Sequence, residues 1–189
     1  MYNEKFHTRR IGKPYYPAMA RACLSISRPK SVLDIGCSCG SLLANFPKDL
    51  FKTGLDFGTA SDTFMDEDAH YIEHDLTRGW CNTGKRFDLI NCQEVIEHLP
   101  QNYEDNVMYT IHWNAKPTAT LVFSGAHVGQ RGKGHVNCQP ASYWTYKFIQ
   151  LGWRFSLIKT NRYVKSCGEI LPACYSDNTM VFVRGNINE

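Results

Sequence analysis

The sequence predicts an α/β fold with a mostly parallel sheet, and two observations support this prediction. Short runs rich in apolar and β-branched residues alternate with segments of helical periodicity, which is the order expected of β-α-β units. The composition is that of a folded chain, because 43% of the 189 residues are hydrophobic and 21% are charged. This length predicts one domain over residues 1–189, since domains typically contain about 100–200 residues.

Local signals predict the elements of the first half of the chain. A proline opens a segment whose apolar spacing predicts a helix over 17–27. The β-rich run 31–35 predicts the first strand, and the apolar residues after it predict a helix that ends at Pro47. Two more strands are predicted at 52–56 and 71–74, with a polar, irregular segment between them.

The second half continues the same alternation. The run RFDLINC predicts a strand over 86–92, and it is followed by a helix over 101–114 that closes before Pro117. The run ATLVFS predicts a fifth strand over 119–124, and a Gly-rich loop leads from it into a helix over 140–150.

Two last strands are predicted at 152–158 and 179–184. Residues 159–178 between them are rich in polar and loop-forming residues, so we expect no strong helix there. An antiparallel, hairpin-like pairing of these strands therefore closes the edge of the predicted sheet.

Several classes of protein are excluded or disfavoured. No uncharged apolar run approaches the ~18 residues of a membrane-spanning helix, and the basic N-terminus lacks the apolar core of a secretory signal. We therefore expect a cytoplasmic protein without a membrane partner, whose eight cysteines are free thiols. The formal net charge of +3 neither requires nor excludes an anionic partner.

A glycine turn and a distant acid carry the functional signal. The first predicted strand runs into the turn Asp34-Ile35-Gly36-Cys37-Ser38-Cys39-Gly40, whose glycines allow a tight turn and close approach of a ligand. Asp56, at the end of the second strand, can accept both hydrogen bonds of a ribose diol. Because ligands of open α/β sheets bind beyond the carboxyl ends of the strands, we expect an adenosine-containing cofactor there.

The details of the turn argue against a dinucleotide. The dinucleotide fingerprint is G-x-G-x-x-G, whereas Ser38 takes the middle place here and the third glycine is displaced. Asp34, two residues before Gly36, would repel a pyrophosphate. S-adenosylmethionine, which has no phosphate and carries a sulfonium and an ammonium group, fits better. A nicotinamide oxidoreductase is the weaker alternative.

Four segments in order, VLDIGCSCG, GLDF, EHDLT and FDLINCQEVIEHLP, resemble the motifs of class I S-adenosylmethionine-dependent methyltransferases. The resemblance implies a Rossmann-like three-layer sandwich with a seven-stranded, mostly parallel sheet whose last strand is antiparallel. It implies a cofactor-binding core over 30–125, an N-terminal helical segment over 1–28 that could form a lid from Tyr2 to Tyr16, and an acceptor-loop and sheet-closing part over 126–189.

The resemblance also implies the cofactor residues. The loop under the methionine part would be formed by Asp34, Gly36, Cys37 and Gly40. Asp56 would hold the ribose hydroxyls, and Asp75 and Leu76 would flank the adenine. Phe57, next to Asp56, is a further candidate cofactor-binding residue. Gln93 would line the methionine and methyl-transfer side.

The EVIEH segment has two interpretations. If it begins a helix, Glu94, Glu97 and His98 share one face. The segment resembles ubiquinone-biosynthesis O-methyltransferases and small-RNA 2′-O-methyltransferases, and the latter resemblance implies a Mg²⁺ or Mn²⁺ site completed by His135, with His127 as a second candidate. The alternative is catalysis without a metal, with His98 or His135 as general base.

Methylation of a hydroxyl group on a small molecule or sugar is the function we expect from the resemblance. One alternative is metal-assisted 2′-O-methylation of RNA. Another is a non-catalytic, cofactor-binding partner of a second protein. The sequence does not identify the acceptor, because acceptor pockets in this fold come from the N-terminal segment and the loops after strands four to six.

Overall fold

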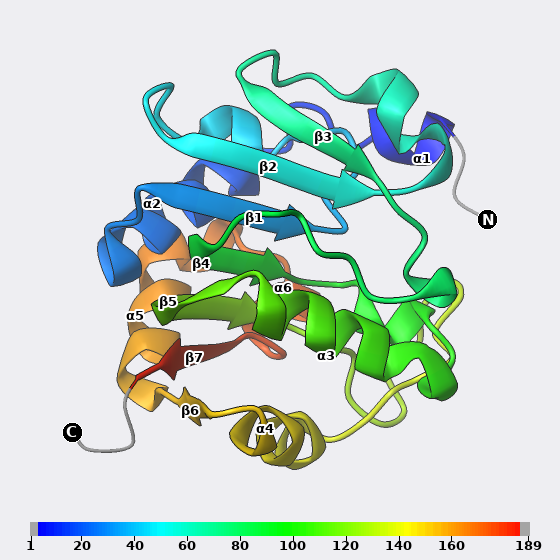
Figure 1. Cartoon of the computed structure of the whole chain (residues 1–189), viewed down its shortest axis with the longest axis vertical. Coiled ribbons are helices and arrows are strands. Elements are labelled where there is room, and N and C mark those ends of the chain that lie inside the picture. Colours follow the sequence, from blue (N-terminus) through cyan, green and yellow to red (C-terminus); the bar gives the residue numbers. More distant parts are fainter. Residues whose placement is uncertain (1–3, 186–189) are drawn as a thin grey trace.

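Seven strands form one sheet in the computed structural model, which describes residues 4–185 (Figure 1). The strands lie in the order β3-β2-β1-β4-β5-β7-β6. Their bounds are β1 Ser31–Ile35, β2 Phe51–Asp56, β3 Ala69–Glu73, β4 Phe87–Cys92, β5 Ala115–Phe123, β6 Trp153–Phe155 and β7 Met180–Arg184. β7 is antiparallel to both of its neighbours, and the other pairs are parallel. The predicted mostly parallel sheet with an antiparallel last strand is confirmed.

Helices cover both faces of this sheet and give the predicted three-layer sandwich (Figure 1). They are α1 Glu4–Thr8, α2 Tyr15–Ser27, α3 Glu104–Trp113, α4 Ala141–Gln150, α5 Leu157–Cys167 and α6 Ala173–Ser176. Alternate strand residues supply two cores, because successive side chains of a strand point to opposite faces. Val32 and Val122 pack with α2 and α5, whereas Leu33 and Leu121 pack with α3 and α4.

The prediction that residues 159–178 lack a strong helix is wrong. α5 occupies 157–167, and Ser156 caps it by accepting a hydrogen bond from the backbone N–H of Lys159. The helix buries Tyr163 and Cys167, four residues apart, against α2, and its exposed side is mostly polar apart from Leu157 and Ile158. The segment is amphipathic, but its many lysines, arginines and other polar residues make its mean hydropathy low, so its composition alone indicates a loop.

Smaller differences concern element ends. The helix expected after β1 is only a 3₁₀ turn at Leu43–Asn45. β6 covers 153–155, so the last part of the strand predicted over 152–158 belongs to α5. β5 begins at Ala115 and includes Pro117, near a register irregularity with β4 that accommodates a residue without a backbone N–H.

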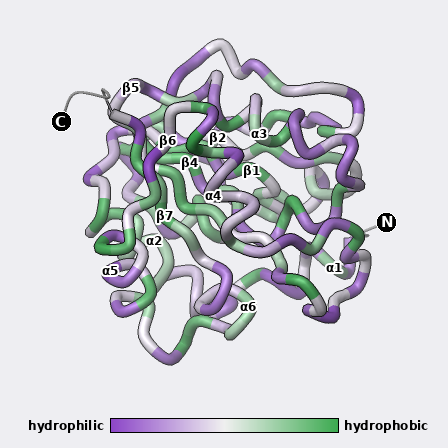
Figure 2. The backbone as a smooth tube through the Cα atoms, turned by 90° about the horizontal axis from the view of Figure 1, so that it is seen from below, coloured by the Kyte–Doolittle hydropathy of each residue, from purple (hydrophilic) through white to green (hydrophobic). Residues whose placement is uncertain are grey.

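The distribution of hydrophobic residues matches the arrangement of sheet and loops. Figure 2 shows hydrophobic stretches concentrated on the central strands and hydrophilic residues on the outer loops. Within residues 4–185, no helix combines the length and apolar character needed to span a bilayer. Residues 1–3, including Tyr2 of the expected lid, and residues 186–189 lie outside the described part of the chain.

Candidate cofactor and acceptor site

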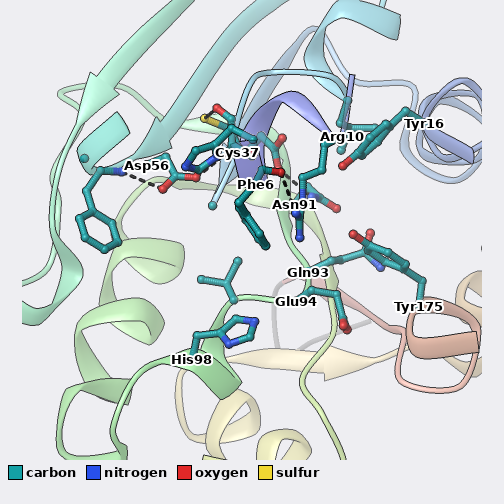
Figure 3. Close-up of a pocket in the computed structure, with 18 of the residues that line it drawn as sticks. Phe6, Arg10, Tyr16, Cys37, Asp56, Asn91, Gln93, Glu94, His98 and Tyr175 are labelled. Atoms are coloured by element: carbon teal, nitrogen blue, oxygen red, sulfur yellow. Dashed lines mark hydrogen bonds between the residues drawn. The ribbon is translucent and has the colours of Figure 1, made fainter. Parts of the chain in front are cut away.

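A cavity of about 380 Å³ lies beyond the carboxyl ends of β1, β2 and β4 (Figure 3). This is the edge at which ligands bind in open α/β sheets. Most of the residues predicted from sequence to hold a cofactor line it: Asp34, Gly36, Cys37, Asp56, Phe57, Asp75 and Gln93. Two predicted residues, Gly40 and Leu76, are not among the lining residues. The cavity therefore brings together side chains from four separate segments of the chain.

The glycine turn forms one wall of the cavity. Gly36 has a φ of +74°, and a Cβ at this position would overlap the Cγ2 atom of Val95. Gly40 has a φ of +75°, and its Cβ would lie 2.7 Å from the ring of Phe64. Both glycines are required by the backbone, but only Gly36 approaches the space where a ligand would lie.

Asp56 fixes the turn after β1 to the end of β2. Its carboxylate accepts hydrogen bonds from the backbone N–H groups of Ser38, at 2.7 Å, and Phe57, at 2.8 Å. Burial raises the pKa of Asp56, and these two hydrogen bonds partly oppose that shift. The bonds orient the carboxylate at the edge of the cavity, with acceptor capacity left for a ligand.

Asp34 is the second buried acid. Burial raises its pKa to about 7, while a hydrogen bond from the Nδ2 group of Asn91, at 2.7 Å, opposes the shift. Asn91 lies on β4 beside β1 and also lines the cavity. Sequence analysis did not identify Asn91, because its pairing with Asp34 depends on strand order and not on local sequence.

Gln93 belongs to a buried network that shapes the far side of the cavity. Its amide donates to the hydroxyl of Thr179 at 2.8 Å and accepts from the hydroxyl of Tyr163 at 3.1 Å. Thr179 in turn donates to the backbone carbonyl of Tyr175, whose side chain lines the cavity. Gln93 therefore ties β4 to the segment that carries Tyr175.

The N-terminal segment supplies part of the cavity wall, and Figure 3 shows Phe6 and Arg10 among the lining residues. Phe6, His7 and Arg10 line it, and the Arg10 guanidinium lies 3.6 Å from the centre of the Phe6 ring. His7 is buried, and its Nδ1 atom is hydrogen-bonded to the hydroxyl of Ser38 at 2.7 Å. Ser38 has a φ of +53°. Ser38, in the middle of the glycine turn, is thus hydrogen-bonded to α1.

The EVIEH segment does not start a helix, so the predicted shared helical face is wrong. Glu94 has a φ of +56°, and only a 3₁₀ turn follows at Ile96–His98. Ligand atoms of Glu97, His98 and His135 nevertheless lie within 4.8 Å of one another. Glu94 is outside this group of three, as is His127, whose Nδ1 atom contacts the backbone carbonyl of Val128.

Among the three grouped residues, Glu97 is the one whose surroundings suit a missing ligand. It is fully buried, and among the described residues no group forms a hydrogen bond of good geometry with either carboxylate oxygen, although the backbone N–H groups of Glu97 and Ala126 lie close enough to lower its pKa slightly. Burial, with the nearby Glu94 charge as a smaller cause, raises the Glu97 pKa to about 8. The Nδ1 atoms of His98 and His135 contact backbone carbonyls, at 3.2 and 3.3 Å, so they must donate and each Nε2 atom is left as an acceptor.

Comparison with known proteins agrees with this architecture. The structure of a sugar N-methyltransferase, KedS8, from a Streptoalloteichus species superposes with a TM-score of 0.72 at 14% identity, covering 98% of this chain and 95% of that one. An O-methyltransferase family protein from Burkholderia thailandensis superposes with a TM-score of 0.66 at 13% sequence identity, covering 95% of this chain and 57% of that one. Human N-acetylserotonin methyltransferase in complex with SAM superposes with a TM-score of 0.61 at 15% identity, covering 92% of this chain and 52% of that one.

These likenesses establish the fold. The chain spans little more than half the length of the last two proteins. No curated protein sequence matches the chain. The sequence does match a family described as a methyltransferase domain over residues 7–160, which is most of its length. The chain therefore belongs to the methyltransferase domain family, with the fold of the class I S-adenosylmethionine-dependent enzymes.

Proposed function

We propose that the protein transfers a methyl group from S-adenosylmethionine to a hydroxyl group of a small molecule or sugar. The observation that carries this proposal is the cavity at the carboxyl ends of β1, β2 and β4, whose wall carries the carboxylates of Asp34, Asp56 and Asp75. Such a wall suits a cationic nucleoside and repels a diphosphate. Human N-acetylserotonin methyltransferase, a structure with SAM bound, shares the fold.

The chain would hold S-adenosylmethionine by its own polar groups. Asp34 and the backbone at Gly36 would face the methionine part, and Asp56 would accept hydrogen bonds from the ribose hydroxyls. Asp75 would meet the exocyclic amine of the adenine, with Phe57 against the ring. Gly40 and Leu76 act indirectly in this proposal, since they support the turn and the core and do not line the cavity.

His98 is the candidate for handling the acceptor proton. When bound, S-adenosylmethionine supplies an electrophilic methyl group on its sulfonium. His98 lines the same cavity, and burial lowers its pKa, so its imidazole is uncharged at neutral pH. Its Nε2 atom, left as an acceptor by the contact of Nδ1 with Gly134, could take the proton that a hydroxyl acceptor gives up. His135 lies beside it, with ring centres 5.0 Å apart, and does not line the cavity.

Calorimetric binding of S-adenosylhomocysteine tests the proposal. We expect micromolar binding to the wild type and at least a hundredfold loss in Asp56→Ala, because a buried hydrogen-bonding carboxylate that also orients the turn is removed. Asp62→Ala, which removes an exposed acid of the segment after Asp56, is the matched control and should bind normally. Equal affinity in all three proteins would refute the ribose assignment, and protection from unfolding by NADH alone would refute the cofactor.

A second candidate is metal-assisted methylation of the 2′-hydroxyl of RNA. It is favoured by the grouping of Glu97, His98 and His135 and by the buried Glu97 carboxylate, which has no side-chain donor in the part of the chain that the structure describes. Nδ1 contacts with carbonyls are the usual support of metal-ligating histidines. Two imidazoles and a carboxylate suit Mn²⁺ better than Mg²⁺. Glu97 would be the anionic ligand, and a bound ion would supply a Lewis acid close to His98.

Titration with Mn²⁺ alone tests the metal site. The wild type should bind one ion, and Glu97→Gln and His135→Ala should each weaken binding by at least tenfold. His127→Ala is the matched control, because His127 lies outside the group. If the wild type binds no Mn²⁺, or if methyl transfer to a 2′-hydroxyl is indifferent to a chelator, the second candidate is excluded and the general-base role of His98 remains.

A further inference from the structure

We infer that Glu94 binds and orients the nucleophilic group of the methyl acceptor, and that Ser124 is a positioning residue that fixes the Glu94 carboxylate. This inference rests on the proposed function, because it assigns the acceptor side of the same cavity. Neither role follows from the sequence motifs, which place Glu94 with the metal ligands and do not single out Ser124.

The backbone at Glu94 has a conformation that is uncommon for a residue with a side chain. Glu94 directly follows Gln93 at the end of β4 and lines the cavity. Its φ of +56° lies in the left-handed region, which is uncommon for a residue with a side chain. Strained conformations of this kind persist where the surrounding structure enforces them, and they concentrate at functional sites. The turn directs the chain away from the strand immediately after Gln93.

Ser124 enforces this conformation through two hydrogen bonds. It is fully buried and follows β5, the strand beside β4. Its hydroxyl accepts from the backbone N–H of Glu94 at 2.9 Å and donates its only proton to Glu94 Oε1 at 3.0 Å. The Oγ atom of Ser124 is therefore hydrogen-bonded to both the backbone and the carboxylate of Glu94. An alanine in place of Ser124 would release both.

The position of Glu94 in the cavity indicates the acceptor. Figure 3 shows Glu94 on the side of His98 and Tyr175, across the cavity from Asp56. The proposed cofactor acids lie at the carboxyl ends of β1 and β2 and after β3, whereas Glu94 follows β4.

The Cys174 thiol also donates to the Glu94 carboxylate, and a thiol is a weak donor that a hydroxyl or amine can displace. The Arg10 and His135 side chains act on the same carboxylate through their charge. A carboxylate so placed would accept a hydrogen bond from the group that receives the methyl.

Glu94 is also separate from the candidate metal site. The ligand atoms of Glu97, His98 and His135 group together without it. The carboxylate of Glu94 accepts a hydrogen bond from Ser124, whereas neither oxygen of Glu97 has a side-chain donor among residues 4–185. The two glutamates of the EVIEH segment thus have different surroundings, and we assign them different roles.

A probe that needs no knowledge of the acceptor tests this inference. Sinefungin is an analogue of S-adenosylmethionine in which a carbon bearing an amine replaces the methylated sulfonium, so its amine lies where the methyl group would leave. The wild type should bind sinefungin at least tenfold more tightly than S-adenosylhomocysteine, because the amine meets the Glu94 carboxylate. Glu94→Gln should lose this preference while its affinity for S-adenosylhomocysteine changes less than twofold.

Ser124→Ala separates positioning from general structural damage. It should reduce the preference for sinefungin about threefold and leave the affinity for S-adenosylhomocysteine unchanged, a ratio that a merely destabilised fold would not alter. Glu169→Gln, at an exposed glutamate, is the control for charge. If S-adenosylhomocysteine does not bind the wild type, the proposed function fails. If it binds and the preference survives in both Glu94→Gln and Ser124→Ala, this inference alone is overturned.

Discussion

Gly36 stands where the turn after β1 passes closest to the segment after β4. With a φ of +74° and Val95 against its Cα, an alanine there would face two separate penalties. The left-handed backbone costs about 1–2 kcal/mol, and forcing a methyl group against Val95 adds about 1–3 kcal/mol. We expect Gly36→Ala to lower the free energy of unfolding, measured by urea denaturation, by about 2–5 kcal/mol and to weaken S-adenosylhomocysteine binding.

Gly12 offers a matched comparison for this substitution. Its φ is +69°, but a Cβ there meets no atom of the described residues within 4 Å. Gly12→Ala should therefore show only the backbone cost of about 1–2 kcal/mol. Equal destabilisation of the two variants would mean that the close approach of Val95 contributes nothing to the site.

The sequence could predict residues whose role depends on their own strand. Asp34, Gly36 and Asp56 stand at strand ends within recognisable motifs, and the structure places them in the cavity. Asn91 and Ser124 could not be found in this way, because their partners are 57 and 30 positions away and only the strand order brings them together. Polar residues in apolar strands give a sign of such pairing but do not identify the partner.

At the scale of an element, α1 is too short to be stable alone, so its place over the cavity depends on contacts with the rest of the protein. His7 supplies one of them through its hydrogen bond with Ser38. Loss of a buried hydrogen bond costs about 1 kcal/mol, or about fivefold in the population of an open state. We expect His7→Ala and Ser38→Ala to be cleaved by trypsin near Lys5 and Arg9 about fivefold faster than the wild type.

The control for this experiment is Thr8→Ala, on the exposed side of the same helix. It should be cleaved at the wild-type rate, and S-adenosylhomocysteine should slow cleavage of the wild type by favouring the closed state. Fast cleavage of Thr8→Ala, or no change in His7→Ala, would show that the bond to Ser38 does not hold α1. The sequence predicted a lid in this region without indicating which residue would hold it.

At the scale of the whole molecule, the parallel sheet collects ionisable groups at one edge and buries them. The carboxyl ends of β1, β2 and β4 lead to Asp34, Asp56 and Glu94, and burial raises the pKa of all three. In the unliganded protein, each of these acids is therefore less stable in its charged form than in the unfolded chain. The site that would attract a cationic ligand is maintained at a cost in stability.

Asp34 makes this cost measurable. Burial raises its pKa to about 7 in the folded protein, against about 3.9 in an unfolded chain. Its contribution to stability is thus fully present below pH 4 and is lost as the pH rises to about 7. Asp34→Asn keeps an oxygen that accepts from Asn91 but cannot ionise. The free energy of unfolding of Asp34→Asn minus that of the wild type should therefore increase between pH 4.5 and 7.5.

Urea denaturation at several pH values checks this expectation, and the ligand supplies an internal test. Asp56 and Glu94 titrate in both proteins, so the difference reports Asp34 together with its smaller electrostatic coupling to Asp56. Saturating S-adenosylhomocysteine should flatten the increase, because its ammonium group stabilises the charged form of Asp34. Parallel stability curves for the two proteins from pH 4.5 to 7.5 would show that Asp34 ionises as easily in the fold as in water. Asp34 would then carry no desolvation penalty for a cationic ligand to relieve.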